Sequence, residues 1–291
     1  MQSSEWQAIR CLVSVPASRP ALIAKARAAN ADAVLIDLED AVAPGDKDTA
    51  RHAVADIAGA RPTIVRVNAV GTPWCHQDVL ACAVPGGPDA IMLPKVEYPG
   101  DLEFLDRLLS GAEALSGRTT PLAVLALIES ATGLANVREI AATSDRTGAL
   151  VLGYADLGAS LGRSTARRAH RWLYAQEAVL TAARSADLAA LDGPYLGVAD
   201  DDELRESAEH AAALGFDGKW VIHPRQIETV TAVFTPSAGE IAQARATVDA
   251  LAAARTTNRG AIALDGRMID EALAVSARRL LARAGERLGS A

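Results

Sequence analysis

Two carboxylates, Glu129 and Asp156, stand at the ends of apolar runs that have the character of buried strands. Glu129 ends LAVLALIE (122–129), and Asp156 ends ALVLGYAD (149–156). If these strands belong to a barrel, their ends meet at one mouth. Two carboxylates there offer oxygen ligands to a hard divalent cation such as Mg²⁺, which keeps other positions for water and substrate. The alternative is that each acid caps the helix that follows it.

Arg66 lies inside the apolar run TIVRVN (63–68), where a guanidinium needs a partner or a cavity. Arg binds carboxylates with paired hydrogen bonds, so Arg66 suits an acid substrate. A 2-oxo acid would also chelate a nearby cation, which would act as a Lewis acid on its carbonyl. A structural ion pair with Asp37, Glu39 or Asp40 is the other interpretation, and both are compatible.

Other polar residues stand near the ends of apolar runs or around the first run, namely Asp37, Lys95, Asp192, His223, Arg10, Arg19 and Lys25. For any one of them an ordinary solvated or hydrogen-bonded role is the plain interpretation. The basic residues around the first run are solvated cations or contacts for phosphate groups of a ligand. For His223, which precedes a proline, we favour a structural role.

Eight runs read as strands, and Ala-, Glu- and Arg-rich stretches with helical spacing lie between them. Most of the runs are continuously apolar, as is typical of parallel strands buried on both faces. The repeated alternation predicts a (β/α)₈ TIM barrel rather than an open sheet. The predicted strands are 12–16, 33–37, 63–68, 90–95, 122–129, 149–156, 190–194 and 219–224.

The pattern changes after residue 235, so we expect a catalytic barrel over 1–235 and a C-terminal helical segment over 236–291. Residues 236–255 read as one helix that Ser237 and Glu240 open with capping-box spacing. A polar linker (256–260), a segment with a DG turn (261–270) and a last helix (271–285) follow. This tail is too small to fold alone, and it either packs on its own barrel or covers the mouth of a neighbour.

Composition excludes several classes of function. The formal charge of −7 disfavours nucleic acid as a partner, and aromatic residues make up only 4% of the 291 residues. No apolar run is long enough for a membrane span, and the N-terminus lacks an apolar signal core. Three cysteines fit no zinc pattern. We therefore expect a cytoplasmic protein without nucleic-acid or membrane partners.

Ordered motifs along nearly the whole chain resemble the HpcH/HpaI aldolase and citrate lyase β-subunit (CitE-like) superfamily. Within it, the acyl-CoA lyases of the malyl-CoA lyase type look most similar, chiefly through LDGPY and GKWVIHP. One departure is GYAD, where many relatives read GAED before the aspartate, and this departure bears on the substrate. The matching strings include SVPASRP, DAVLIDLEDAVAPGDK, VRVNAVGTPW, IMLPKVE, LIESATGL, GYADLGASLG, LGFDGKWVIHPRQI and GAIALDGRMID.

The resemblance implies a role for each matched residue. Glu129 and Asp156 correspond to the Mg²⁺ ligands, with Mn²⁺ as a substitute, and Arg66 to the residue that holds the 2-oxo acid. The resemblance implies that Asp270 is the catalytic acid/base, delivered by the C-terminal segment of a neighbouring subunit, which acts as a lid. Glu39 and Asp40 match residues that order metal-bound water, and Arg19 and Lys25 match positions near the phosphates of CoA.

The implied activity is reversible carbon–carbon cleavage of a 3-hydroxyacyl-CoA of the malyl-CoA or citramalyl-CoA type. Its products are acetyl-CoA and a 2-oxo acid, glyoxylate or pyruvate. The resemblance also implies a homo-oligomer, trimer or hexamer. The alternatives are a citrate lyase β-type subunit, a malyl-CoA thioesterase, and a non-catalytic oligomeric binding protein on the same scaffold.

Overall fold

A computed structural model of the protein describes residues 3–54, 57, 59–163, 172–256, 261–264 and 267–284. Eight parallel strands close into a barrel in sequence order, which confirms the predicted TIM barrel. Each strand pairs with its neighbours in the sequence, and β1 pairs with β8 through Cys11–Lys219 and Leu12–Trp220. The strands are β1 (Cys11–Pro16), β2 (Ala33–Asp37), β3 (Thr63–Arg66), β4 (Ala90–Leu93), β5 (Ala123–Ile128), β6 (Thr147–Leu152), β7 (Ala189–Asp192) and β8 (Gly218–Val221).

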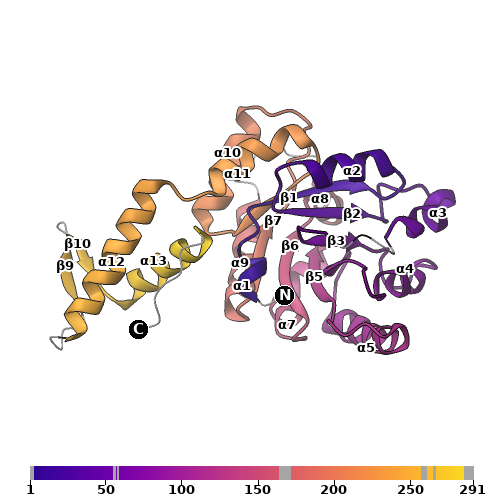
Figure 1. Ribbon diagram of the computed structural model, residues 1–291, viewed down its shortest axis with the longest axis horizontal. Coiled ribbons are helices and arrows are strands. Elements are labelled where there is room, and N and C mark those ends of the chain that lie inside the picture. The colour runs from indigo at the N-terminus through magenta and orange to yellow at the C-terminus, as the bar shows by residue number, and fades with distance from the viewer. Residues whose placement is uncertain are drawn as a thin grey trace. The chain divides into compact units, whose positions relative to one another are not determined.

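Helices follow the strands and lie outside the ring that the strands form (Figure 1). The N-terminal helix α1 (Ser3–Trp6) precedes β1. The others in this part are α2 (Pro20–Ala28), α3 (Lys47–Arg51), α4 (Cys75–Cys82), α5 (Pro99–Ser116), α6 (Ala131–Ala135), α7 (Val137–Ala141), α8 (Tyr154–Ser160), α9 (Leu173–Ser185), α10 (Asp202–Leu214) and α11 (Ile227–Phe234), with short 3₁₀ turns η1 (Pro44–Asp46), η2 (His52–Val54) and η4 (Pro224–Gln226).

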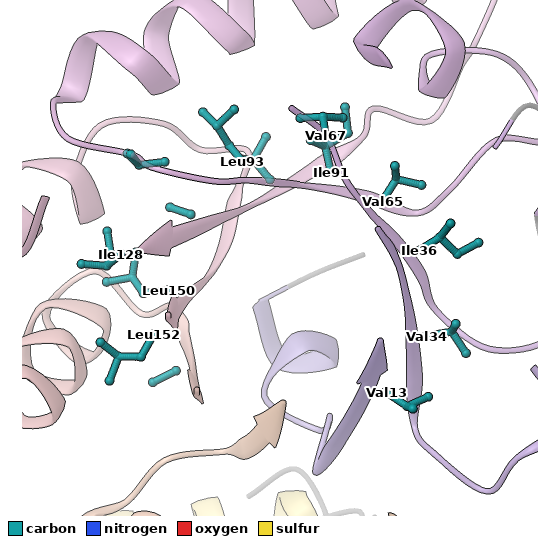
Figure 2. Close-up of a cluster of buried hydrophobic side chains, with 14 of the residues drawn as sticks. Val13, Val34, Ile36, Val65, Val67, Ile91, Leu93, Ile128, Leu150 and Leu152 are labelled. Atoms are coloured by element: carbon teal, nitrogen blue, oxygen red, sulfur yellow. The ribbon is translucent and has the colours of Figure 1, made fainter. Parts of the chain in front are cut away.

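The strands are apolar on both faces because each face packs against a different core. Alternate residues such as Leu35, Met92 and Trp220 fill the barrel interior. Their neighbours along the strands point outward and pack against the helices. These contacts form a second and larger core. Figure 2 shows members of this outer core around the ring, including Val34 and Ile36 on β2. This double burial explains why the runs lack the polar alternation of a half-exposed sheet.

The chain divides into two compact units, Met1–Phe234 and Thr235–Ala291. In the second unit α12 (Ala238–Thr256) packs against α13 (Glu271–Arg283), with Ala244 and Leu281 among their shared buried residues. Ser237 and Glu240 form the predicted capping box: the Glu240 amide donates to Ser237 Oγ and the Ser237 amide donates to Glu240 Oε2. Between these helices in the sequence, β9 (Ile262–Leu264) and β10 (Arg267–Ile269) pair as antiparallel strands.

Several details differ from the sequence-based expectation. The run 149–156 is not one strand, because β6 ends at Leu152 and Tyr154–Ser160 form α8. Helix α11 was not expected. The expected linker over 256–260, the DG turn at 265–266 and the beginning of the expected helix 163–186 lie wholly or mostly outside the described residues. Within the described part of the chain, no helix is long and apolar enough to cross a membrane.

Candidate active site at the barrel mouth

Arg66 ends β3 with its guanidinium held by two carboxylates from the neighbouring strand β2 and the residues after it. Its Nε and Nη2 donate to the two oxygens of Asp37 at 2.8 and 2.6 Å. Its Nη1 lies 2.9 Å from Glu39 Oε2, and its guanidinium carbon lies 5.3 Å from the centre of the Trp220 ring inside the barrel. Arg66, Asp37 and Glu39 are all buried. The structural ion pair considered for Arg66 is therefore present.

Lys95 brings a second cation to the same carboxylates. Its Nζ donates to Glu39 Oε1 at 2.5 Å and lies 3.8 Å from Asp40 Oδ1. Burial lowers the pKa of Lys95, but the hydrogen bond and charge of Glu39 outweigh it, so this pKa lies above its ordinary value. Two cations, Arg66 and Lys95, thus offset the charge of the neighbouring carboxylates Asp37, Glu39 and Asp40. Burial nevertheless raises the pKa of Glu39 above its ordinary value, against the lowering effect of both cations.

Glu129 follows β5 directly, and its carboxylate is buried. The pKa of Glu129 is raised to about 8, chiefly by burial; the charges of Glu39 and Asp156 also raise it, while Arg66 lowers it. Oε1 accepts the main-chain amide of Lys95 at 3.0 Å. Ser130, not Glu129, caps α6, since its side chain accepts the Gly133 amide. The capping interpretation of Glu129 is therefore wrong.

Asp156 lies in the first turn of α8, whose N-cap position is Gly153. Asp156 is therefore a residue of the helix rather than its cap, and it is partly exposed. Its charge acts on Glu129 and on Lys95, so it faces the same group of residues. A side chain on Gly153 would place its Cβ 2.5 Å from Glu129 Oε2. Glycine here leaves the space beside the Glu129 carboxylate open.

A buried network that the sequence did not single out holds the backbone of this site. Lys47 Nζ donates to the carbonyls of Leu38 and Glu39, both at 2.9 Å, and to Asn68 Oδ1 at 2.6 Å. Asp78 in turn accepts the amide and the Nδ2 of Asn68. The signal was in DAVAPGDK and VRVNAVGTPW, where a lysine and an asparagine follow adjacent strands, but their contacts depend on the folded loop.

Arg19, one of the two residues matched to CoA phosphates, lines an open cavity at the end of β1. The cavity has a volume of about 430 Å³ and is lined by Pro16, Ser18, Arg19, Ala41, Ala43 and Asp46. Arg19 stands at the N-cap position of α2 and is exposed. Lys25 is also exposed, further along α2. Of these two residues, only Arg19 lines the cavity.

Asp270 belongs to the second unit, where it stands between β10 and α13. It is the N-cap residue of α13, and its Oδ1 accepts the Leu273 amide at 3.2 Å. Asp270 is partly exposed. Its local structure thus includes a capping role that the sequence motif did not reveal.

Two of the polar residues at strand ends have structural partners. Asp192 pairs with Lys219 on the outer face of the barrel, where both are fully buried. His223 is the N-cap of the turn η4, and its Nδ1 accepts the Arg225 amide at 3.2 Å. The favoured structural interpretation of His223 is confirmed.

The donor set at the mouth fits a hard cation. Glu129 and Asp156 supply carboxylate oxygens, and burial raises the pKa of Glu129 because it removes the charged carboxylate from water. Among the described residues, no three His, Cys, Asp or Glu side chains gather as a closed metal cage. A cation on this pair would therefore keep positions for water and substrate, as Mg²⁺ usually does.

A closed (β/α)₈ barrel with buried carboxylates, Arg66 and Lys95 at its mouth has the architecture of a barrel enzyme. Comparison with known proteins makes this specific. The family model for HpcH/HpaI aldolase/citrate lyase matches residues 10–224, and the chain belongs to this family. The predicted membership of the family is confirmed.

Curated relatives in this family are named as lyases. The L-malyl-CoA/beta-methylmalyl-CoA lyase of Cereibacter sphaeroides (strain ATCC 17029 / ATH 2.4.9) is 38% identical over an alignment of 285 positions, which covers 90% of this chain and 90% of its own. The citrate lyase subunit beta of Leuconostoc mesenteroides subsp. cremoris is 35% identical over 94% of this chain and 92% of its own. The expectation of a lyase is thereby confirmed.

A solved structure supports the same relationship. Protein CitE from Mycobacterium tuberculosis, in complex with magnesium, acetoacetate and coenzyme A, superimposes with a TM-score of 0.77. It is 38% identical in sequence, and the match covers 96% of this chain and 100% of that one. At this identity the likeness includes sequence as well as fold.

Proposed function

We propose that the protein is a Mg²⁺-dependent acyl-CoA lyase that reversibly cleaves a 3-hydroxyacyl-CoA into acetyl-CoA and a 2-oxo acid. The observation that carries the proposal is the group at the mouth: Glu129 has a raised pKa, and the charges of Asp156 and Arg66 both act on it. The relatives named malyl-CoA lyases and the CitE complex with magnesium and coenzyme A support the same chemistry.

Glu129 and Asp156 would hold the Mg²⁺ ion, with Mn²⁺ as a substitute. When bound, the ion would polarise the carbonyl of the 2-oxo acid as a Lewis acid. Arg66 would hold the carboxylate of the oxo acid, and the Nη1 that now meets Glu39 is the nitrogen that would turn to it, since Nε and Nη2 are engaged by Asp37. Glu39 and Asp40 would order water around the ion.

Asp270 would move the proton at the α-carbon of the thioester. In the condensation direction it would take a proton from the methyl group of acetyl-CoA. The resulting enolate would attack the keto carbon, and the keto oxygen, left as an alkoxide, would take a proton from water to become the hydroxyl. In cleavage the hydroxyl would lose its proton to water and become the carbonyl as the carbon–carbon bond breaks. The electron pair of that bond would form the enolate of the thioester, and Asp270 would protonate the enolate carbon. We propose that Asp270 comes from a neighbouring subunit of a trimer or hexamer, whose C-terminal segment (236–291) excludes water as a lid.

CoA would lie along the end of β1, and the cavity of about 430 Å³ beside Arg19 supports this placement. Arg19 would pair with a phosphate of CoA, with Lys25 further along α2 as the second cation. Ala41 and Ala43 leave the wall of this cavity without bulky side chains.

The test is a condensation screen with the purified chain alone. Acetyl-CoA and propionyl-CoA are each paired with glyoxylate and pyruvate in the presence of Mg²⁺, and products are identified by mass. We expect a hydroxyacyl-CoA product from at least one pair.

A second candidate, a citrate lyase β-type subunit, is favoured by the 35% identity to the Leuconostoc protein. It would be inactive on CoA esters without its partner subunits. With malyl-CoA as the substrate, release of free CoA and malate without carbon–carbon cleavage would instead indicate the thioesterase.

A further inference from the structure

Asp192 and Lys219 form a fully buried ion pair on the outer face of the barrel. The adjacent residues Leu191 and Trp220 face the barrel interior, so the alternation of the strands directs Asp192 and Lys219 outward. Lys219 Nζ lies 2.5 Å from Asp192 Oδ2 and donates to the carbonyl of Gly193 at 2.8 Å. Burying two charges costs several kcal/mol per ion before pairing, so the pair calls for an explanation beyond stability.

The second oxygen of Asp192 leads to the helix that carries Asp156. Asp192 Oδ1 accepts the hydroxyl of Tyr154, the first residue of α8. Gln176 on α9 donates to the same hydroxyl oxygen at 2.8 Å, and its Oε1 lies 3.2 Å from Nε2 of His210 on α10. The network therefore connects β7 and β8 with α9 and α10, and it meets α8 at the first residue of that helix.

Tyr154 is also fixed by packing. Its ring centroid lies 5.0 Å from that of Trp172, and a Cβ on Gly193 would come within 2.8 Å of its Cδ2. A hydroxyl held by a buried carboxylate and a buried amide, on a ring packed on both sides, leaves the first residue of α8 little freedom.

Tyr154 and Asp156 lie on opposite sides of the first turn of α8. Successive residues of an α-helix are about 100° apart, so side chains two positions apart project about 200° from each other. Tyr154 points outward to Asp192, and Asp156 acts on Glu129 and Lys95 at the mouth. The outer network thus fixes the first turn of α8 on the side opposite to Asp156.

We propose that Tyr154 is a positioning residue for Asp156 and that the Asp192–Lys219 pair and Gln176 fix it in this role. The inference rests on the proposed function, because it takes Asp156 as a metal ligand. Partners that orient metal ligands typically affect metal affinity by about 10- to 100-fold. The GYAD motif then has a physical meaning: its tyrosine secures the turn that carries the metal aspartate to β7.

The test measures Mn²⁺ binding to the metal-free full-length protein by electron paramagnetic resonance, without any turnover. Tyr154→Phe keeps the ring and removes the hydroxyl, and we expect the Kd for Mn²⁺ to rise about tenfold. Tyr195→Phe is the matched control, since this buried phenol also meets carboxylates, of Asp201 and Glu203, but not Asp192. Its Kd should stay within about twofold of the unaltered protein.

Thermal melts in EDTA separate positioning from stability, because both tyrosine variants lose a buried hydrogen bond. A lower melting temperature for Tyr154→Phe with an unchanged Kd for Mn²⁺ would overturn the inference. Gln176→Met tests the network without altering α8 and should weaken Mn²⁺ binding severalfold; unchanged binding in this variant overturns the inference even if Tyr154→Phe does not fold. If the unaltered protein bound no Mn²⁺, the metal assignment would fall together with the inference, a result distinct from unchanged binding in the variants.

Discussion

The main-chain amide of Lys95 donates to Oε1 of Glu129 across 3.0 Å, while the backbone of Lys95 holds a φ of 53°. This left-handed conformation is strained for a residue with a side chain, and it costs about 1–2 kcal/mol. The same residue places its ammonium on Glu39. One strained residue thus connects the ends of β2, β4 and β5 at the mouth.

Lys95→Gly and Lys95→Met separate the two contributions of this residue. Both variants lose the ammonium, but glycine adopts the left-handed backbone without strain, and methionine does not. We expect the free energy of unfolding of Lys95→Gly to exceed that of Lys95→Met by about 1 kcal/mol in urea denaturation. Equal stabilities, or a less stable glycine variant, would show that the backbone conformation is not strained in solution.

Glu129 makes the stability of the metal-free protein depend on pH. Its pKa is about 8 in the folded chain against an ordinary value of 4.5, mainly because of burial. The folded state therefore binds the proton more tightly than the unfolded state. This contribution is complete below pH 4.5 and is lost as pH rises through about 8. In EDTA, the stability difference between Glu129→Gln and the unaltered protein should shift in favour of the variant between pH 6 and 9.

Metal binding should show the opposite dependence on pH, because a carboxylate must lose its proton to bind a cation. Below pH 8 each bound ion displaces the proton of Glu129. We expect the affinity for Mn²⁺ to rise about tenfold per pH unit up to about pH 8 and then to level off. Calorimetry in buffers of different ionisation enthalpy would report the released proton. A flat profile between pH 6 and 8 would contradict the raised pKa.

The buried pair of Arg66 and Asp37 should contribute to stability as well as to the site. Asp37→Asn keeps the shape of the side chain but leaves the guanidinium without its charged partner. We expect a loss of roughly 3 kcal/mol, the low end for a broken buried pair, measured by urea denaturation. Glu103→Gln, which breaks the exposed pair with Arg107, should change stability by less than about 0.5 kcal/mol. Similar losses in both variants would contradict the account.

Asp270→Asn separates the chemistry of Asp270 from its structural role. Asn caps helices about as well as Asp, so α13 should keep its first turn. We expect 2-oxo acid binding to persist while turnover falls by orders of magnitude. If the lid acts between subunits, mixing Asp270→Asn with Arg66→Ala protein should restore part of the activity. Subunits that demonstrably exchange without any recovery would contradict the arrangement between subunits.

The sequence predicted the barrel because burial on both faces leaves a continuous apolar signal at every strand. It predicted the neighbourhood of Glu129, Arg66 and Glu39 because the ends of parallel strands meet at one mouth. It did not separate Asp192 from this set, since one register step turns a side chain to the outer face. Nor did it show Lys47 or Tyr154 as partners, because their contacts join segments that only the folded loops bring together.

The central claim is that Glu129 and Asp156 hold the one Mg²⁺ ion that the reaction needs. The most direct measurement is the condensation of acetyl-CoA with glyoxylate or pyruvate by the purified protein, with products identified by mass in EDTA and after Mg²⁺ is restored. The account predicts hydroxyacyl-CoA product only with Mg²⁺, and loss of this response in Glu129→Gln and Asp156→Asn. Equal product formation in EDTA, or unimpaired activity of both variants, would contradict it.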